Sequence, residues 1–325
     1  MKDYISIQYL RAVAALMVVM HHIFSTNLVD YDGKTGWLAG GVDIFFVISG
    51  FIMVQSTGGR DYAPAQFYLR RIIRIVPIYW IATLAVMWNT EWDWLNAVKS
   101  LFFIPYVDPQ TQSLMPILQP GWTLNYEMFF YLIFGMSLLL REKIRVFAVA
   151  ACLMMLVLVG IVFQPAGASG FYTHPILLEF LLGMLIARFG IKLPIMFAPI
   201  ALLAIPHLWD AVEFRSLTLG LPAAIIVASL LSVERQIPKV PFLMRLGDAS
   251  YSIYLFHLGA LGLVAAVAGS YPMSPVLVLF AGLIMAALVG LSIHHYLEMP
   301  INNVLKTWSR HQAESRSKTQ SVPNG

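Results

Sequence analysis

The chain has 325 residues, of which 59% are hydrophobic and only 12% are charged, and its formal net charge is +4. An ordinary soluble domain carries roughly 25% charged residues, so this composition excludes one. Apolar runs recur along the whole length, and runs of about 20 apolar residues are typical of transmembrane helices. The composition therefore predicts an all-α, polytopic integral membrane protein.

Hydropathy predicts about ten membrane spans. Their ranges are 5–26, 40–57, 72–90, 122–140, 145–163, 173–189, 193–208, 216–232, 249–269 and 275–297. The seventh span is short and interrupted by proline. The first span lacks a small-residue cleavage site, so we expect it to be an uncleaved anchor. We expect residues 1–305 to form one transmembrane domain and residues 306–325 to form a polar, disordered tail.

Lysine and arginine residues predict the orientation. With a cytoplasmic N-terminus, 17 of the 21 fall on the cytoplasmic side, whereas Lys34, Lys99 and Arg215 fall outside. Such an imbalance follows the positive-inside rule and places both termini in the cytoplasm. The net positive charge is thereby explained by topology, and no nucleic-acid partner is expected.

Two ionisable residues share one face of the first span. Arg11 and His22 are eleven positions apart, which is almost three helical turns, or about 16 Å along the axis. Because an ionisable group inside a membrane span is costly, it is by default a functional hypothesis. The pair predicts a polar path into the bilayer.

Three ionisable groups from different spans have similar depth. His22, Asp43 and Glu127 each lie four or five positions from the outer end of their span. A carboxylate beside an imidazole orients its tautomer and stabilises its charged form, which suits a general base. The alternative is that each group makes a separate interhelical hydrogen bond, but the common depth favours a site.

Two further spans carry polar faces at helical spacing. One face holds Thr123, Glu127 and Tyr131; the other holds Ser250, Tyr254 and His257. For Ser250 and Tyr254 the alternative is packing hydrogen bonds, and for His257 packing and pocket lining remain open.

In the second span, small residues permit close helix contact, namely Gly40, Gly41, Ser49 and Gly50. Between spans, residues 91–121 form a long aromatic loop, expected either to cover a site or to lie at the membrane interface.

Charged groups mark the predicted cytoplasmic ends of two spans. Arg71 and Arg74 are three positions apart, and arginine suits bidentate phosphate recognition; the alternative is a topology signal. Glu298 follows two adjacent histidines, but neighbouring side chains diverge by about 100° around a helix, so no metal site is expected.

These motifs together resemble the membrane acyltransferase 3 family from Leu10 to about Pro300. The resemblance rests on the Arg11–His22 pair and on GGVDIFFVISGF, LRRIIRIVPIYW, GWTLNYEMFFY, LGDASYSIYLFH and YLEMP. The family usually has serine where this chain has Thr123, and the substitution retains the hydroxyl.

The resemblance implies an enzyme that moves an acyl group, usually acetyl, from cytosolic acyl-CoA to a hydroxyl of a bacterial surface glycan such as exopolysaccharide. It implies the cytoplasmic (inner) membrane, a glycan acceptor, either free or lipid-linked, and association with polysaccharide assembly machinery. Acetyl-CoA is the expected donor substrate, with no permanently bound cofactor. The expected phosphate-binding residues are Arg70, Arg71 and Arg74.

The implied catalytic group is His22 as general base, oriented by Asp43 or Glu127, with Arg11 along the donor channel or stabilising negative charge. A covalent acyl-histidine is the less favoured variant. The expected pocket residues are Trp122, Thr123, Tyr131, Ser250, Tyr254, His257 and Glu298.

A transporter or flippase is the competing class, because it also has polar residues facing the interior of a bundle. Transporters often contain repeated halves with paired broken helices. Here only the seventh span is interrupted, without a symmetric partner, which favours an enzyme.

Overall fold

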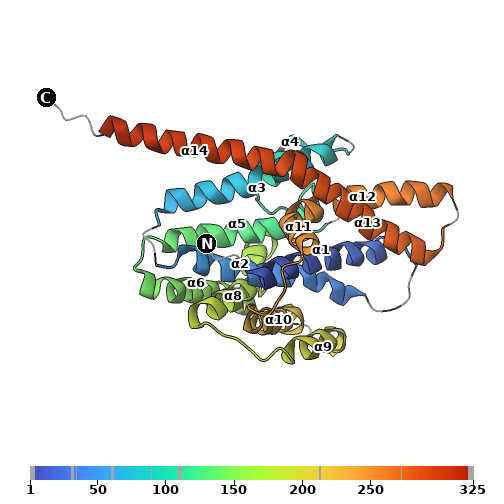
Figure 1. Ribbon diagram of the computed structural model, residues 1–325, viewed down its shortest axis with the longest axis horizontal. Coiled ribbons are helices and arrows are strands. Elements are labelled where there is room, and N and C mark those ends of the chain that lie inside the picture. The colour runs from blue at the N-terminus through green and yellow to red at the C-terminus, as the bar shows by residue number, and fades with distance from the viewer. Residues whose placement is uncertain are drawn as a thin grey trace.

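The computed structural model describes residues 4–320, except 31, 32, 34, 60, 61, 89, 109–111, 212, 213 and 272. In this part of the chain the regular structure is helical throughout, and the helices pack into a bundle from which α14 projects at one end (Figure 1). In chain order the elements are α1 (Ile5–Ser25), η1 (Gly36–Ala39), α2 (Gly40–Thr57), α3 (Pro64–Met87), α4 (Trp94–Leu101), α5 (Gly121–Ser137), α6 (Glu142–Phe163), α7 (Gly167–Tyr172), α8 (Leu177–Phe189), α9 (Phe197–Ala211), η2 (Ser216–Gly220), α10 (Leu221–Ser232), α11 (Pro241–Asp248), α12 (Ser250–Ser270), α13 (Pro275–Ile293), η3 (His294–Glu298) and α14 (Met299–Gln320).

The all-helical membrane architecture is confirmed, but the number of ten spans is not. Each predicted range overlaps a helix, yet within the described residues six helical segments are long and apolar enough to cross a bilayer. They are Ile5–Ser25, Gly36–Thr57, Glu142–Phe163, Gly167–Phe189, Ser250–Ser270 and Pro275–Ser309. The helix α5 has 17 residues, fewer than the about 20 that span a hydrocarbon core, and α3 contains three arginines.

Two boundaries differ from expectation for physical reasons. The helix α3 begins at Pro64 rather than near 72, because proline suits the first helical turn. The arginines of α3 therefore lie inside a helix and not at its start. The helix α14 continues through Gln320 where a disordered tail was expected from 306. It extends the apolar helix α13 through η3, so the costly nucleation of a new helix is not needed.

The helices α2 and α8 pack backbone against backbone. A Cβ atom added at Gly50 would lie 2.0 Å from the carbonyl oxygen of Phe180, and one at Gly183 would lie 1.9 Å from that of Val47. On the α1 side, a Cβ at Gly41 would lie 2.4 Å from the carbonyl oxygen of Ala14. The predicted close contacts of α2 are thus present, and they require glycine at these positions.

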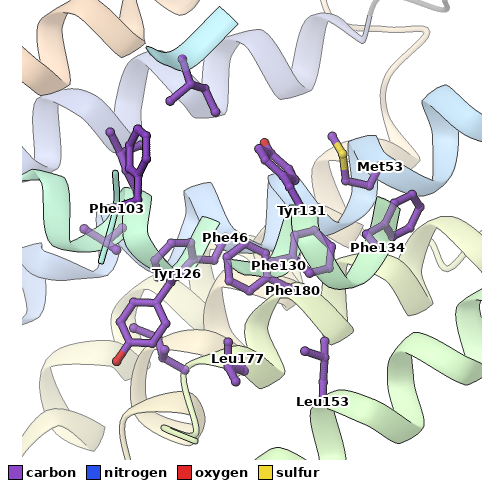
Figure 2. Packing of buried hydrophobic residues seen from close by; sticks show 14 of the residues in the cluster. Phe46, Met53, Phe103, Tyr126, Phe130, Tyr131, Phe134, Leu153, Leu177 and Phe180 are labelled. Atoms are coloured by element: carbon purple, nitrogen blue, oxygen red, sulfur yellow. The ribbon is translucent and has the colours of Figure 1, made fainter. Parts of the chain in front are cut away.

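Aromatic side chains fill the space between α2, α5 and α8 (Figure 2). The Phe130 and Phe180 rings stack with centroids 4.4 Å apart, and Phe46 meets Phe180 at 4.7 Å. Such pairs add about 0.5–1.5 kcal/mol each beyond the area they bury. This cluster supports the wall that α2 and α5 present to α12.

The long segment after α3 covers one end of the bundle. It contains α4, and its Phe103 ring stacks on Tyr79 with centroids 4.5 Å apart. The Tyr79 hydroxyl donates to the Ser100 carbonyl at 2.9 Å. The side chains of Trp92, Trp94 and Phe102 are exposed. The segment therefore has some aromatic residues packed against the bundle and others at the surface.

Replacing Gly50 by alanine is expected to destabilise the protein. The added methyl group meets the α8 backbone, and overpacking of this kind costs about 1–3 kcal/mol, more than the roughly 1 kcal/mol that alanine gains in helix propensity. Thermal unfolding in detergent measures the effect. The matched control is Gly259→Ala in α12, where nothing lies within 4 Å of the new atom. A Gly50→Ala protein as stable as the control would contradict the backbone contact.

Candidate functional site

A cavity of about 160 Å³ lies between α1, α2, α3, α5 and α12. Eight of the predicted site residues line it: Arg11, Arg71, Arg74, Thr123, Glu127, Tyr131, Ser250 and Tyr254. Its remaining wall is mostly apolar and comes largely from α2, including Phe45, Ile52 and Met53. Sequence positions far apart in the chain therefore meet around one enclosed space.

One end of the cavity is rich in arginine. The Arg71 guanidinium lies over the rings of Tyr131 and Phe67, 5.4 and 5.5 Å from their centroids, and its Nε is buried without a hydrogen-bond partner. Arg74 is exposed at the rim, and Arg11 donates to the Gln8 side chain at 2.9 Å. A buried donor without a partner is costly, so this end is prepared for an anionic ligand.

Glu127 is held in the cavity wall. Its Oε1 accepts hydrogen bonds from the Tyr131 hydroxyl and, at 3.0 Å, from Ser49 Oγ. The Ser49 and Tyr131 hydroxyls are themselves 3.1 Å apart. This network ties α2 to α5, and one carboxylate against three arginines leaves the lining cationic.

The opposite end of the cavity is formed by two hydroxyl groups. Thr123 Oγ1 and Tyr254 Oη are 2.8 Å apart, and both donate to the Pro120 carbonyl at 3.0 Å. Ser250 also faces the cavity, with its Oγ buried and unpaired. Because Tyr254 precedes His257 by three positions in α12, this end lies one helical turn from the histidines.

His22 and His257 form a pair beyond that end. His257 Nε2 lies 3.2 Å from His22 Nδ1, and the ring centroids are 4.7 Å apart. Each Nδ1 also meets a backbone carbonyl, that of Tyr254 at 2.7 Å for His257 and that of Val18 at 2.9 Å for His22. A carbonyl only accepts, so both Nδ1 atoms carry protons. The neutral His22 ring then has its lone pair on Nε2.

The expectation that a carboxylate orients His22 is wrong. Asp43 is fully buried and forms a two-point ion pair with Arg215, with Arg215 Nη2 2.6 Å from Asp43 Oδ2 and Nε 3.2 Å from Oδ1. Glu127 bonds to Tyr131 and Ser49. The sequence predicted a similar depth for these groups, but their side chains face different partners around their helices.

Sequence reasoning missed two members of the Asp43 cluster. Arg215 was counted as an outer-loop cation, although it precedes η2 and reaches into the bundle. Glu179 of α8 is also fully buried and lies within electrostatic range of Asp43 and Arg215. The available signal was a lone carboxylate inside the apolar run 173–189, which is itself unusual in a membrane span.

Besides the histidine pair and Asp43, three more predicted site residues lie outside the cavity. Arg70 is exposed and lies over the Tyr62 ring, because one helical position turns it about 100° away from its neighbour. Trp122 packs edge-on against Tyr126. Glu298 accepts from Ser252 Oγ at 2.7 Å and meets His294 Nδ1 at 2.8 Å, so it ties η3 to α12.

Comparison with known proteins places this sequence in a family. Residues 4–295 match the family described as an acyltransferase domain. The chain is 35% identical to the exopolysaccharide production protein ExoZ of Rhizobium meliloti (strain 1021), over 81% of this chain and 89% of the relative. It is 26% identical to the acyltransferase MdmB of Streptomyces mycarofaciens, over 78% and 77% of the two chains.

A more distant similarity covers part of the chain. It is 28% identical to the putative peptidoglycan O-acetyltransferase YrhL of Bacillus subtilis (strain 168), over 49% of this chain and 28% of the relative. No solved structure matches the chain.

Replacing Asp43 by asparagine is expected to destabilise the fold. Among the described residues, removing the Asp43 charge leaves Arg215 with only the Glu179 carboxylate, which does not hydrogen-bond to it. Because the Arg215 side chain is also 24% exposed, we expect a loss of about 2–3 kcal/mol, below that of a fully buried pair. Denaturation of Asp43→Asn, Arg215→Gln and the double variant measures the coupling. If the two single effects simply add, the ion pair is not a stabilising contact.

Proposed function

The chain belongs to the membrane acyltransferase family whose domain it matches over residues 4–295, and from this premise we propose that it is an O-acyltransferase that acts on a bacterial surface glycan. The donor is cytosolic acyl-CoA, with acetyl as the acyl group, and the acceptor is a hydroxyl of an exopolysaccharide. The name of the Rhizobium relative supports the acceptor class, and the names of the other relatives support acyl transfer. These names favour an enzyme over a transporter.

The observation that carries the proposal is a cationic cavity that extends from Arg71 and Arg74 to Thr123 and Tyr254, one helical turn from His257. The phosphates of acyl-CoA bind at the arginine end, where Arg71 has an unpaired Nε and arginine offers bidentate contacts to phosphate. A cavity of about 160 Å³ takes the acyl end of the donor and its arm, while the nucleotide stays outside. The thioester then lies at the Thr123 and Tyr254 end.

The proposed chemistry uses His22 Nε2 as general base. It accepts the proton of the glycan hydroxyl while the hydroxyl oxygen attacks the thioester carbonyl. The tetrahedral intermediate then collapses, the carbon–sulfur bond breaks, and the CoA thiolate takes the proton. The cationic lining stabilises the negative charge on the carbonyl oxygen, together with a Thr123 or Tyr254 hydroxyl that turns its proton from the Pro120 carbonyl toward that oxygen.

His257 is the proposed positioning residue. Its Nε2 accepts from His22 Nδ1, which keeps the His22 lone pair on Nε2 in the way that a carboxylate does in other general-base sites. Asp43 and Glu127 act through the fold and the cavity wall, and Arg11 supplies positive charge along the donor path.

The proposed setting is the bacterial cytoplasmic membrane, with both termini in the cytoplasm. The arginine end then faces the cytosol, where acyl-CoA is made, and the histidines lie toward the outer leaflet. A lipid-linked glycan reaches them from that side, in association with polysaccharide assembly machinery. Exposed Trp92, Trp94 and Phe102 offer faces on which sugar rings stack.

Replacing His22 by alanine is expected to reduce transfer by about 10²–10⁴-fold, the usual contribution of a general base. The assay follows radiolabel from acetyl-CoA to purified exopolysaccharide, with protein inserted in membranes to the same level. His257→Ala is expected to lose less activity, because the base remains and only its orientation is relaxed. Full activity of His22→Ala would refute the assignment.

Replacing Arg71 and Arg74 by glutamine is expected to raise the apparent KM for acyl-CoA by about tenfold or more, with a smaller effect on kcat, because charge-assisted phosphate contacts contribute about 1.5–3 kcal/mol each. Arg70→Gln is the matched control, since Arg70 lies on the same helix but outside the cavity. Equal KM values for the double variant and the control would make all three residues topology signals only.

A further inference from the structure

A second cavity, of about 350 Å³, lies where the ends of α2, α5, α6 and α8 meet. Lys143, Arg145 and Arg188 contribute to its lining, together with Glu142 and apolar side chains such as Phe134. Met53 lines the first cavity and Phe134 the second, and both belong to the hydrophobic cluster of Figure 2. No residue that lines the second cavity also lines the first. The proposed acyl transfer does not use the second cavity.

Arg145 is the central group of this cavity. Its exposed fraction is only 6%, and its Nε is buried without a hydrogen-bond partner. Its guanidinium makes a long contact, 3.5 Å from Nη2 to the Leu140 carbonyl oxygen. A buried cation that lacks a counter-ion is costly, and the cavity beside it provides room for an anion.

The remaining charges make the cavity cationic. Glu142 is its one carboxylate, and Glu142 Oε1 already accepts from the Gly59 backbone N–H at 2.8 Å. No ion pair joins Lys143, Arg145 or Arg188 to a carboxylate within the described residues. The helix α6 also begins here, and its positive N-terminal end adds to the attraction for an anion.

An apolar surface continues from the cavity. Ile144 and Phe147 of α6 are exposed, as are Leu140 just before α6 and Phe189 at the end of α8. The Arg188 guanidinium lies 6.0 Å from the Phe147 ring centroid, where the charged and apolar surfaces join. A free phosphate needs only the cations, whereas a membrane lipid uses both surfaces at once.

We propose that this cavity binds the phosphodiester headgroup of an anionic membrane lipid, with the acyl chains lying along the exposed face of α6. The site is at the same end of the bundle as Arg71 and Arg74. In the topology set by the positive charges, that end lies at the cytoplasmic leaflet, where anionic lipid headgroups are available.

Native mass spectrometry and thermal unfolding of the full chain test the proposal without any transfer assay. Protein in phosphatidylcholine nanodiscs is compared with protein in nanodiscs that also contain phosphatidylglycerol. We expect retained phosphatidylglycerol and a higher Tm in the second case. In Arg145→Gln/Arg188→Gln, retention is expected to fall about tenfold or more, because charge-assisted contacts to the lipid phosphate are lost.

Three controls separate the possible outcomes. Arg141→Gln removes an exposed cation next to α6 that does not line the cavity, and its retention should match the parent. Arg188→Gln alone changes an exposed side chain and keeps the test valid if the Arg145 variant fails to fold. Arg145→Lys should restore part of the binding.

Equal lipid retention in Arg141→Gln and in the cavity variants would overturn the proposal. Equal stabilisation by inorganic phosphate alone would reduce the site to one for free anions and would overturn the lipid assignment. A loss of CoA binding in the cavity variants, with lipid retention unchanged, would instead assign the cavity to the donor nucleotide.

Discussion

The close approach of α2 to α1 and α8 is the constraint on which the rest of the structure depends. Glycine at positions 41, 50 and 183 lets the backbones touch, so α2 lies in the middle of the bundle. From there it presents Asp43 to Arg215 and Ser49 to Glu127, while its apolar residues form much of the first cavity. In a membrane, where lipid is as apolar as leucine, such close packing replaces the hydrophobic effect as the driving force for helix association.

The buried charges are placed so that most have a partner. Asp43 with Arg215 and Glu298 with His294 tie segments together. The exceptions are Glu179, whose carboxylate oxygens are buried without a hydrogen-bond partner, and Arg71 and Arg145, which each keep a buried Nε without one. The two arginines each border a cavity. A low-dielectric interior makes an unpaired donor expensive, which is why we assign ligands to these two places.

The sequence predicted which residues share a depth, but not which of them touch. Hydropathy and helical spacing placed Arg11, Arg71, Glu127 and Tyr254 in polar stripes, and all four line one cavity. Depth alone also grouped Asp43 with His22, although Asp43 faces Arg215. The rotation of each helix about its axis depends on tertiary packing, including glycine contacts with partners far away in the chain. The pairing of His22 with His257 could not be derived without it.

The shape of the first cavity has a consequence for the order of events in the proposed reaction. Its arginine end is exposed at Arg74, whereas its other end, at the Thr123–Tyr254 contact, is buried and lies one helical turn from His257. In the proposed reaction, acyl-CoA enters at the arginine end, and the free CoA leaves by the same end after the acyl group has been transferred. Free CoA and acyl-CoA then compete for the same entrance. A glycan that reaches the histidines from the opposite membrane face does not block it.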